Sequence, residues 1–395
     1  MGRLRTIEDL GDLQGRRVFV RVDFNVPLED GRVTDDLRIT AVIPTLEDLR
    51  GRGSALVLAT HLGRPGGEPA AELRLDPVAA RLQETAGFGV RKLDEVTGDA
   101  VAKACASLGP GEVVLLENLR FDPGEEENDP GFADALAELT DTYVDDAFGA
   151  AHRVHASVVG VAERLPAAAG RLMAREVEVL SRLREDPEEP FVAILGGAKV
   201  SDKLGVVEAL LERVDALLIG GAMAFTFIAA QGGEVGDSSV EEDRLDDVRG
   251  ALKVADERGV PVLLPEDVVA ASEVSADVRK QTIRADAIPR GLRGLDVGPR
   301  TVEEFTRVLA DARTVFWNGP MGVFELEPFA LGTRSVAQAV AGIDAFTVVG
   351  GGDSVAAIRK LGFQDQVDHL STGGGASLEF LESGDLSGVA VLREP

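Results

Sequence analysis

Short apolar runs of strand length alternate with segments whose apolar residues recur at helical spacing along most of the chain. In the first half, the helical patterns lie at residues 40–53, 76–87 and 132–140, and the strand-like runs lie at residues 16–24, 55–60, 112–118 and 142–149. This alternation predicts a parallel sheet with helices on both faces. Because such sheets bind ligands at the carboxyl ends of their strands, the loops after the strands are the expected places for chemistry.

The alternation is interrupted at residues 165–190 and then begins again. Apolar residues recur here at helical spacing, which predicts a long helix at about 168–184; they are Leu172, Met173, Val177, Val179, Leu180 and Leu183. This segment is either a helix that joins two domains or one more surface helix, and the fresh start of the pattern after it favours the first interpretation. The second series of strand-like runs lies at residues 191–197, 215–221, 260–267, 314–320 and 346–352.

Two segments depart from this second series. Residues 266–300 read as an insertion into the second sheet, and residues 382–392 are expected to form a lone terminal strand. The fold class predicted from the pattern is therefore α/β, with two parallel-sheet domains joined by a long helix.

Two glycine triplets stand out in the second half, at residues 350–352 and 373–375. The first follows a strand-like run and leads through Asp353 and Ser354 into a helical pattern, and the second also precedes a helical pattern. Glycines allow a close approach of ligands, and the free N–H groups of a helix start suit phosphate. Asp353 is placed to hold Mg²⁺ directly or through water. Ordinary turns would explain one triplet, but the pair favours phosphate binding.

Length and composition limit the possible functions. A chain of 395 residues, 45% of them hydrophobic, is long enough to bury two cores. It contains no apolar run of 18 residues, and its first residues lack the apolar region of a signal peptide, so we expect a cytoplasmic protein. The single cysteine, Cys105, allows no internal disulfide and no cysteine-based metal cluster, and is expected to be a buried small apolar residue.

The chain is strongly acidic, with a formal net charge of −27. This charge argues against non-specific binding to nucleic acid. Basic residues comprise 34 arginines and only seven lysines. A salt-rich cytoplasm would explain an acidic, lysine-poor surface, because salt screens self-repulsion; an acidic protein from a GC-rich genome explains it equally well.

Polar residues of unusual type follow the strand-like runs of the first half. They are Arg21, Asp23, Asn25, Arg38, His61, Arg64, Arg120, His152, Arg153 and His155. The carboxyl ends of parallel strands meet at one edge of a sheet, and the guanidinium fork matches carboxylate and phosphate. Each arginine alone would be a surface ion-pair partner, but together they predict a site for a small polyanionic substrate.

Two of the seven lysines, Lys199 and Lys203, lie four residues apart in the second half. Lys203 is expected in the first turn of a helix capped by Ser201 and Asp202. Its charge would oppose the helix dipole there, and a bound phosphate would remove that conflict. This is neither a Walker A loop nor a dinucleotide fingerprint.

Two further segments offer contacts for a nucleoside. Residues 219–227 combine glycines with flat apolar side chains that suit an adenine ring. Glu325, at the end of the segment 317–325, has a carboxylate that accepts hydrogen bonds from ribose hydroxyls. Trp317 is expected in the core rather than as a stacking surface.

Taken together, these motifs resemble those of the phosphoglycerate kinase family, in family order and over nearly the whole chain. They are RVDFNVP, HLGRP, ENLRF, DAFGAAHRVHAS, LGGAKVSDK, WNGPMGVFE, GGGDS and STGGGASLEFLE. The resemblance implies two Rossmann-like domains with a cleft between them. Residues 1–167 would bind 3-phosphoglycerate, residues 168–380 would bind nucleotide, and the tail 381–395 would return to the first domain.

The resemblance also implies the reaction, which is reversible Mg²⁺-dependent phosphoryl transfer between 1,3-bisphosphoglycerate and ADP, giving 3-phosphoglycerate and ATP in glycolysis. The acceptor in the reverse direction is a carboxylate, which is already ionised at neutral pH, so no general base is expected. Catalysis then consists of positioning and charge stabilisation. Ligands held on two domains would further require hinge closure. A monomer with small-molecule partners, no nucleic acid and no membrane is implied.

Individual residues follow from the same resemblance. The 3-phosphoglycerate site would comprise Asp23, Phe24, Asn25, Arg38, His61, Leu62, Gly63, Arg64, Arg120 and Arg153. The nucleotide site would comprise Lys199, Lys203, Gly220, Gly221, Gly294, Leu295, Asn318, Glu325, Gly351, Gly352, Asp353 and Ser354, with Asp353 holding the metal. The transferring phosphoryl group would meet Arg38, Lys199, Lys203 and the N–H groups of Gly373, Gly374 and Gly375.

Three positions depart from the family pattern: Asp145 stands where Asn is common, Glu266 replaces an Asp, and the tail reads DLSGV instead of LPGV. None of these changes removes a charged ligand contact. Two other functions remain for comparison. A dehydrogenase would need a dinucleotide fingerprint, and a catalytically inactive nucleotide-binding sensor of the same fold would not need the arginines of the first half.

Overall fold

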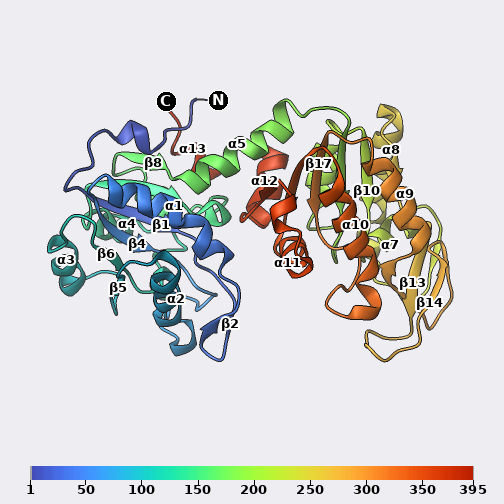
Figure 1. Cartoon of the computed structure of the whole chain (residues 1–395), viewed down its shortest axis with the longest axis horizontal. Coiled ribbons are helices and arrows are strands. Elements are labelled where there is room, and N and C mark those ends of the chain that lie inside the picture. Colours follow the sequence, from blue (N-terminus) through green and yellow to red (C-terminus); the bar gives the residue numbers. More distant parts are fainter. Residues whose placement is uncertain (1, 395) are drawn as a thin grey trace. The chain divides into compact units, whose positions relative to one another are not determined.

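The computed structural model describes residues 2–394 and divides into two compact units, each built around its own sheet (Figure 1). The first unit runs to Glu178 and includes the tail from Asp385, and the second unit is Val179–Gly384. Helix α5 (Arg171–Glu185) begins in the first unit and ends in the second. Among the residues described, no helix has the length and apolar character needed to cross a membrane.

The sheet of the first unit has six parallel strands in the order β5-β6-β4-β1-β7-β8. The strands are β1 (Arg17–Val22), β4 (Ala55–Ala59), β5 (Arg91–Lys92), β6 (Val113–Leu115), β7 (Thr142–Asp146) and β8 (Ala167–Ala169). The central strands are nearly continuous apolar runs because helices and loops cover both faces of a parallel sheet. Strand β1 lies between β4 and β7, so consecutive connections diverge at this point of the sheet.

Helices α1 to α4 connect the strands of the first unit, and a short helix α13 belongs to its tail. Their bounds are α1 (Leu37–Gly51), α2 (Asp76–Ala86), α3 (Asp99–Ala106), α4 (Pro130–Ala137) and α13 (Ser387–Ala390). A small hairpin, β2 (Leu28–Glu29) with β3 (Arg32–Val33), projects between β1 and α1. The core between α1, α2 and the sheet includes Val20, Leu46 and Leu56, and Cys105 is buried in α3 as expected.

The sheet of the second unit also has six parallel strands, in the order β12-β10-β9-β17-β18-β19. They are β9 (Phe191–Leu195), β10 (Ala216–Ile219), β12 (Val262–Leu263), β17 (Thr314–Asn318), β18 (Phe346–Gly350) and β19 (His369–Leu370). In chain order this is the 3-2-1-4-5-6 arrangement of a Rossmann sheet, whose order reverses between β9 and β17. Trp317 is fully buried in β17, as expected.

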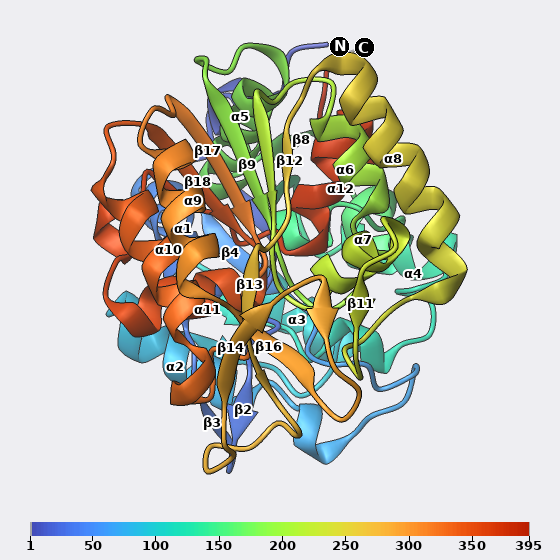
Figure 2. The same ribbon diagram turned by 90° about the vertical axis from the view of Figure 1, so that its right-hand side faces the viewer.

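Helices cover both faces of this second sheet. Figure 2 shows α6, α7 and α8 on one face and α9, α10 and α11 on the other. Their bounds are α6 (Leu204–Leu210), α7 (Ala224–Ala230), α8 (Leu245–Arg258), α9 (Pro299–Leu309), α10 (Leu331–Gly342), α11 (Gly352–Leu361) and α12 (Gly375–Ser383). Helices α11 and α12 begin at the two glycine triplets, as the sequence predicts.

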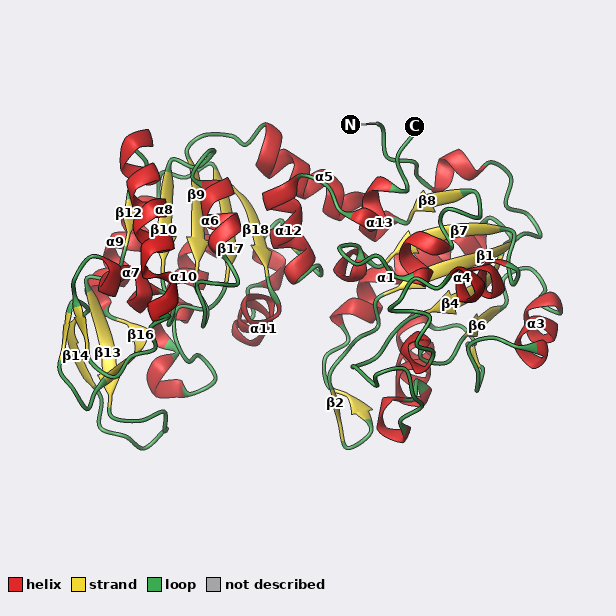
Figure 3. Ribbon diagram, turned by 180° about the vertical axis from the view of Figure 1, so that it is seen from behind, coloured by secondary structure: helices red, strands yellow, loops and turns green. Residues whose placement is uncertain are grey.

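The predicted insertion is a separate antiparallel sheet in the second unit. Strand β13 (Asp267–Ala271) pairs with β14 (Gln281–Arg284) and with β16 (Arg293–Val297), and a bulge interrupts the second pairing (Figure 3). The short strands β11 (Glu234–Val235) and β15 (Ala287–Ile288) lie beside it.

Two predicted elements are corrected by the structure. The alanines at 167–169 form β8, the edge strand of the first sheet, so α5 begins at Arg171 rather than at about 168. The prediction of a lone terminal strand is wrong, because this segment contains helix α13. Leu386, Val389 and Leu392 are all buried and recur every three residues, which is a helical spacing and not the alternation of a strand.

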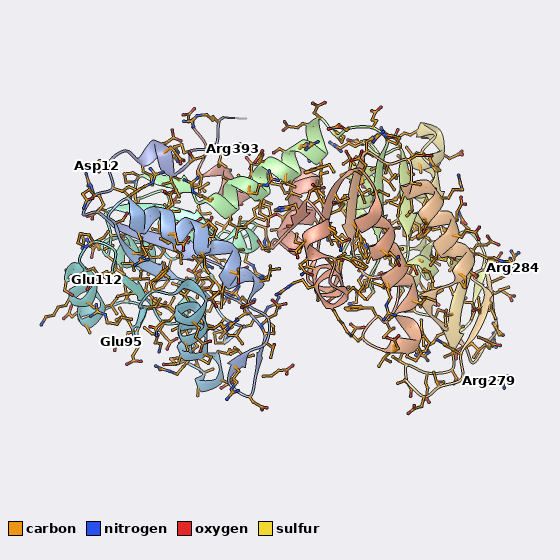
Figure 4. All side chains as sticks on the ribbon, in the orientation of Figure 1. Asp12, Glu95, Glu112, Arg279, Arg284 and Arg393 are labelled. Atoms are coloured by element: carbon orange, nitrogen blue, oxygen red, sulfur yellow. The ribbon has the colours of Figure 1, made fainter. Side chains whose placement is uncertain are left out.

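Charged side chains cover the outside of both units (Figure 4). Asp12, Glu95 and Glu112 project from the first unit, and Arg284 at the end of β14 and Arg279 in the loop before β14 project from the second. Many carboxylates are paired with arginine in short-range surface ion pairs, such as Arg284 with Asp286 at 2.6 Å. Exposed pairs of this kind contribute little stability. The arginines that lack such partners are therefore the better candidates for binding a ligand.

Candidate functional site

The carboxyl ends of β1 and β4 bring together the polar residues predicted in the first unit. Asp23 follows β1, His61 follows β4, and Arg38 lies in the first turn of α1. The Arg38 Nη1 atom lies 3.1 Å from Asp23 Oδ2 and donates to the carbonyl of Asn25 at 3.0 Å. The His61 Nδ1 atom lies 3.9 Å from Asp23 Oδ1. These side chains therefore form one cluster at the point where the sheet's connections diverge.

Backbone contacts fix the loops that carry this cluster. The Asn25 side-chain oxygen accepts from the N–H of Gly63 at 2.9 Å, and Arg120 donates to the carbonyl of Gly63 at 2.6 Å. Gly63 has φ of 63°, and an added Cβ would lie 2.7 Å from Leu73. Glycine is therefore needed for this turn.

Three neighbouring residues support the loops from inside. Phe24 and Leu62, both predicted in the substrate site, have side chains that are almost fully buried and pack beneath these loops. Asn118, which the sequence reasoning missed, accepts from the N–H of Leu62 at 3.1 Å and donates to its carbonyl at 2.8 Å. The polar pair Glu-Asn directly before Leu119 and Arg120 was the available signal.

His61 is held by a buried arginine. Arg21, 1% exposed, donates to Ser157 Oγ at 2.7 Å and lies 3.2 Å from His61 Nδ1. Because a guanidinium only donates, Nδ1 accepts and the proton of the neutral ring lies on Nε2. Burial lowers the pKa of His61 well below its usual value, and the charges of nearby arginines lower it further; they are Arg21, Arg120, Arg153 and Arg38. His61 is therefore a neutral hydrogen-bond donor.

Three arginines of the cluster have guanidinium N–H groups without a hydrogen-bond or ion-pair partner among the described residues. Arg120 is 3% exposed, and its Nε lies 3.0 Å from Glu126 while its Nη2 has no hydrogen-bond partner in the described part of the chain. Arg64 is exposed and Arg153 half-buried. Buried or clustered guanidinium donors without partners are costly unless a ligand binds them, so this arrangement fits a small anion with several oxygens.

Two buried acids lie behind this cluster at the end of β7. Asp145 stands in register with Arg21 on the neighbouring strand β1, and burial raises its pKa to about 6. Asp146 accepts from the N–H of Met173 at 3.0 Å in the first turn of α5, and burial raises its pKa to about 7. Asp145 Oδ2 and Asp146 Oδ2 find no partner among the described residues.

The second unit presents its candidate site where the strand order reverses, after β9 and β17. The loops that follow these strands pack backbone against backbone. An added Cβ at Gly196 would overlap the carbonyl oxygen of Pro320, and one at Gly221 would overlap the backbone of Gly197. Gly221 also has φ of 65°. Only glycine fits these positions. Ligands of such sheets bind just beyond the carboxyl ends of the strands, where these loops lie.

A cavity of about 540 Å³ opens beside these loops. Its lining is largely apolar and includes Gly221, Gly294, Leu295, Glu325 and Asp353 from the predicted nucleotide set, together with Phe225. An added Cβ at Gly294 would overlap the ring of Phe225, so the glycine lies flat against that ring. Gly220 does not line the cavity; its Cα packs against Met321, whose side chain does. A largely apolar cavity of this size with a few polar groups in its lining suits the base of a nucleotide.

A second cavity of about 290 Å³ adjoins the first and is more polar. The predicted residues that line it are Lys199, Lys203, Asn318, Gly351, Gly352, Asp353, Ser354, Gly374 and Gly375. Asp353 lines both cavities, at the first turn of α11. The start of α11 and the start of α12 thus meet in one cavity, which suits phosphate groups.

Two members of the predicted set also make contacts within the protein. The N–H of Gly373 donates to Ser371 Oγ at 3.2 Å. Ser354 is fully buried, and its hydroxyl accepts from the N–H of Gly319 at 2.5 Å, which ties α11 to the loop after β17.

Lys203 lies just before α6 rather than within its first turn. The expected cap is also wrong, because the Ser201 hydroxyl donates to Glu241 at 2.6 Å instead of capping the helix. The Lys203 ammonium donates to the Asn318 carbonyl at 2.9 Å and to the Asn318 side-chain oxygen. Burial lowers the pKa of Lys203 to about 8, against the opposing charge of Asp353. The lysine thus places a partly desolvated charge in the smaller cavity.

The fit of a metal ion can be judged from the donors present. Among the described residues there is no group of three His, Cys, Asp or Glu side chains that would hold a metal alone. Asp353 is a single exposed carboxylate at the junction of the two cavities. Mg²⁺ commonly binds through one or two carboxylates while substrate phosphates and waters complete its shell, so the residues fit an ion that arrives with a nucleotide.

Comparisons with known proteins agree across the chain. The family model described as phosphoglycerate kinase matches residues 7–384. Proteins named phosphoglycerate kinase from Moorella thermoacetica and Rubrobacter xylanophilus are 56% and 57% identical, over 98% and 99% of this chain and 99% and 98% of their own. The solved structure of phosphoglycerate kinase from Coxiella burnetii has a TM-score of 0.87, is 41% identical and covers 99% of both chains. The chain therefore belongs to the phosphoglycerate kinase family.

Proposed function

We propose that the arginine cluster of the first unit binds 3-phosphoglycerate or 1,3-bisphosphoglycerate, and that the two cavities of the second unit bind ADP or ATP with Mg²⁺. Membership of the family makes the chain a phosphotransferase with a carboxyl group as acceptor. The observation that carries the first assignment is the buried Arg120, which has an unpaired donor, together with a neutral histidine and with Arg64 and Arg153, for which the described residues offer no ion pair. A nucleotide-binding sensor would have no use for that set.

The substrate assignment follows from the chemistry of the donors. A phosphoglycerate carries a carboxylate, a phosphate and a hydroxyl, and needs strong donors at both ends with an acceptor between them. Arg64, Arg120 and Arg153 supply charged donors, and His61 supplies a neutral donor through Nε2. Asp23 accepts from the hydroxyl, and Arg38, which contacts Asp23, remains close to the acyl end.

The nucleotide assignment follows from the shapes of the two cavities. The larger, apolar cavity takes the base against Phe225 and Gly294, and Glu325 accepts from the ribose hydroxyls. The smaller cavity takes the phosphates at the starts of α11 and α12. Asp353 would hold Mg²⁺ where the two cavities meet, and the ion when bound would neutralise phosphate charge during the transfer.

The chain's own residues then act by position and charge. The attacking oxygen belongs to a phosphate or an ionised carboxylate, so no side chain removes a proton. Lys203 supplies a desolvated positive charge to the transferring group, which stabilises charge more than an exposed lysine would. The N–H groups of Gly374 and Gly375, at the start of α12, lie beside the same cavity. The hinge closure, monomeric state and cytoplasmic location expected from the sequence remain predictions.

The test is a coupled assay of ATP formation from 1,3-bisphosphoglycerate and Mg-ADP. We expect turnover that depends on both substrates and on Mg²⁺ and that is abolished by chelation with excess EDTA. Calorimetric binding of ADP without any turnover would instead support the nucleotide-binding sensor. Turnover without dependence on Mg²⁺ would contradict the role given to Asp353.

A further inference from the structure

Arg293 has a position in the larger cavity that the proposed reaction does not use. It is the first residue of β16, is paired with Ala271 on β13, and lines the cavity directly before Gly294 and Leu295. Its Nε atom is buried without a hydrogen-bond partner, and its guanidinium forms no ion pair with any residue that the structure describes. In a chain with a net charge of −27, a half-buried arginine without an acid is unusual.

The residues on either side of Arg293 form hydrogen bonds with the segment 237–239. Ser238 accepts from the N–H of Gly294 at 3.0 Å, and the N–H of Asp237 donates to the carbonyl of Leu292 at 2.8 Å. These contacts fix the segment 237–239 against the beginning of β16, on the rim of the cavity. The Asp237 carboxylate is exposed. The guanidinium therefore borders the cavity with unused donors while its backbone is held in place.

The cavity beside it is shaped for a flat ring. Gly294 lies against the Phe225 ring, which is 4% exposed and packed with Ile228 and Val268. Arg293 lines the same cavity, so a base stacked on this surface would turn an edge, and not a face, toward it. The donors of Arg293 would then meet the ring's polar atoms, and not its faces.

A guanidinium donates and never accepts, so it distinguishes purines by their six position. Guanine and hypoxanthine present O6 and N7, two adjacent acceptors that match the arginine fork, whereas adenine presents an N6 amino donor beside N7. We propose that Arg293 contacts this edge and raises the preference of the chain for 6-oxopurine diphosphates, such as IDP and GDP, relative to ADP. The proposal rests on the proposed function, which places the base in this cavity.

The test compares IDP with ADP, which differ at the six position of the base, as phosphoryl acceptors. For Arg293→Met, we expect kcat/KM for IDP to fall at least about fivefold relative to that for ADP, the value expected for loss of one bidentate base contact. The loss should appear in KM, because the contact is remote from the transferring group. Arg293→Gln should shift the ratio further toward ADP, because a carboxamide both accepts from N6 and donates to N7.

Two controls separate recognition from damage to the fold. Arg279→Met removes an exposed arginine in the loop before β14 of the same antiparallel sheet (Figure 4) and should leave the IDP-to-ADP ratio unchanged. If Arg293→Met does not fold, Arg293→Lys serves instead: it keeps the charge but loses the fork, and should lower the ratio by a smaller factor. Calorimetric titration with IDP and ADP gives the same comparison without turnover.

The outcomes are distinguishable. Equal losses for IDP and ADP in Arg293→Met, or a Gln variant with an unchanged ratio, would overturn the role of Arg293 while leaving the proposed reaction intact. Failure of the wild-type protein to bind or turn over either nucleotide would contradict the proposed function itself. A changed ratio in the Met and Gln variants but not in Arg279→Met supports the proposal.

Discussion

The two candidate sites, one in each unit, are built from opposite materials. The site of the first unit consists of polar and charged side chains that lie side by side, from Arg21 through the neutral His61 and Asp23 to Arg38. The site of the second unit consists mostly of glycine backbone and apolar surface, with few charges. A ligand with many charges and few carbons is recognised by donors, whereas a flat base with a phosphate tail is recognised by shape and by helix starts.

This difference predicts how each site fails. Removing a charge should weaken the first site without closing it, because the ligand loses one contact among several. Adding a single methyl group at Gly196, Gly221 or Gly294 should damage the second site, because these glycines leave no space for a Cβ. Substitutions in one unit should also leave the affinity of the other unit's site for its ligand almost unchanged.

The largest effect is expected for Lys203→Ala. Loss of one preorganised charge at the transferring group costs on the order of 3 kcal/mol, so turnover should fall about 100-fold. The affinity for 3-phosphoglycerate, measured by calorimetry, should change little. The exposed Lys253→Ala is the matched control and should keep wild-type turnover. An alanine variant at 203 with turnover within about threefold of wild type would remove the charge of Lys203 from the mechanism.

The same lysine predicts a pH dependence. Burial lowers the pKa of Lys203 to about 8, so the charged form dominates below pH 8 and the neutral form above it. The value of kcat/KM for Mg-ADP should therefore fall as the pH rises through about 8, because this ratio reports ionisations of the free enzyme. An alanine variant at 203 should lose that limb of the profile, and its persistence there would assign the limb to another group.

The next effect tests the glycine-built site. A Cβ in Gly294→Ala would overlap the Phe225 ring, which is packed in a buried cluster and cannot move away freely. Overpacking of this kind costs about 1–3 kcal/mol, so Mg-ADP binding should weaken roughly tenfold or more by calorimetry. The added substitution Phe225→Leu should recover part of the loss. Unchanged ADP affinity in Gly294→Ala would show that the base does not lie against this surface.

A smaller effect, on the other ligand, is expected for Arg64→Ala and Arg153→Ala. Each removes a charged donor that has no ion-pair partner among the described residues, and each should weaken 3-phosphoglycerate binding roughly tenfold. Mg-ADP binding should stay within error. Arg16→Ala, at the amino end of β1, removes an exposed arginine far from the carboxyl ends and is the control. Equal losses for both ligands would contradict the separation of the two sites.

The residues that the sequence identified well are those whose position follows from the sheet. Asp23, His61 and the first glycine triplet follow strand-like runs, and parallel strands bring their carboxyl ends to one edge, so their positions at the sheet edges could be predicted. Both sheets could be predicted as well, because strand-like apolar runs alternate with helical patterns in each half of the chain. The tail was misjudged because a segment of this length fits both periodicities, and only its burial at every third residue decides between them.

Local hydrogen bonds were harder to predict, because they depend on which partner comes close in space. The N–H of Gly373 donates to Ser371, and the Ser201 hydroxyl donates to Glu241 from a distant segment, whereas the sequence suggested a phosphate contact for the first and a helix cap for the second. Asn118 was missed because its partners at Leu62 are 56 residues away. Arg21 was recognised as polar, but its contact with His61 depends on the pairing of β1 with β4.

The smallest effect on ligand binding is expected for Asp145→Asn, which restores the residue common in the family and should change 3-phosphoglycerate affinity by less than about threefold. The substitution should instead change the free energy of unfolding and its dependence on pH. Burial raises the pKa of Asp145 from 3.8 to about 6, so the folded state binds this proton more tightly than the unfolded state. The contribution of the acid to stability is therefore present below about pH 4 and is lost as the pH rises through 6.

Above pH 6 the buried carboxylate is ionised, and a shift of this size corresponds to a cost of up to about 3 kcal/mol. Asparagine has no charge to bury, so Asp145→Asn should have the larger free energy of unfolding at pH 8, with a difference that shrinks toward pH 4. Urea denaturation at several pH values measures this. The exposed Asp12→Asn, visible in Figure 4, should show no such trend. A less stable Asp145→Asn at pH 8 would mean that the ionised carboxylate is stabilised by Arg21, its neighbour in register on β1, by more than burial costs.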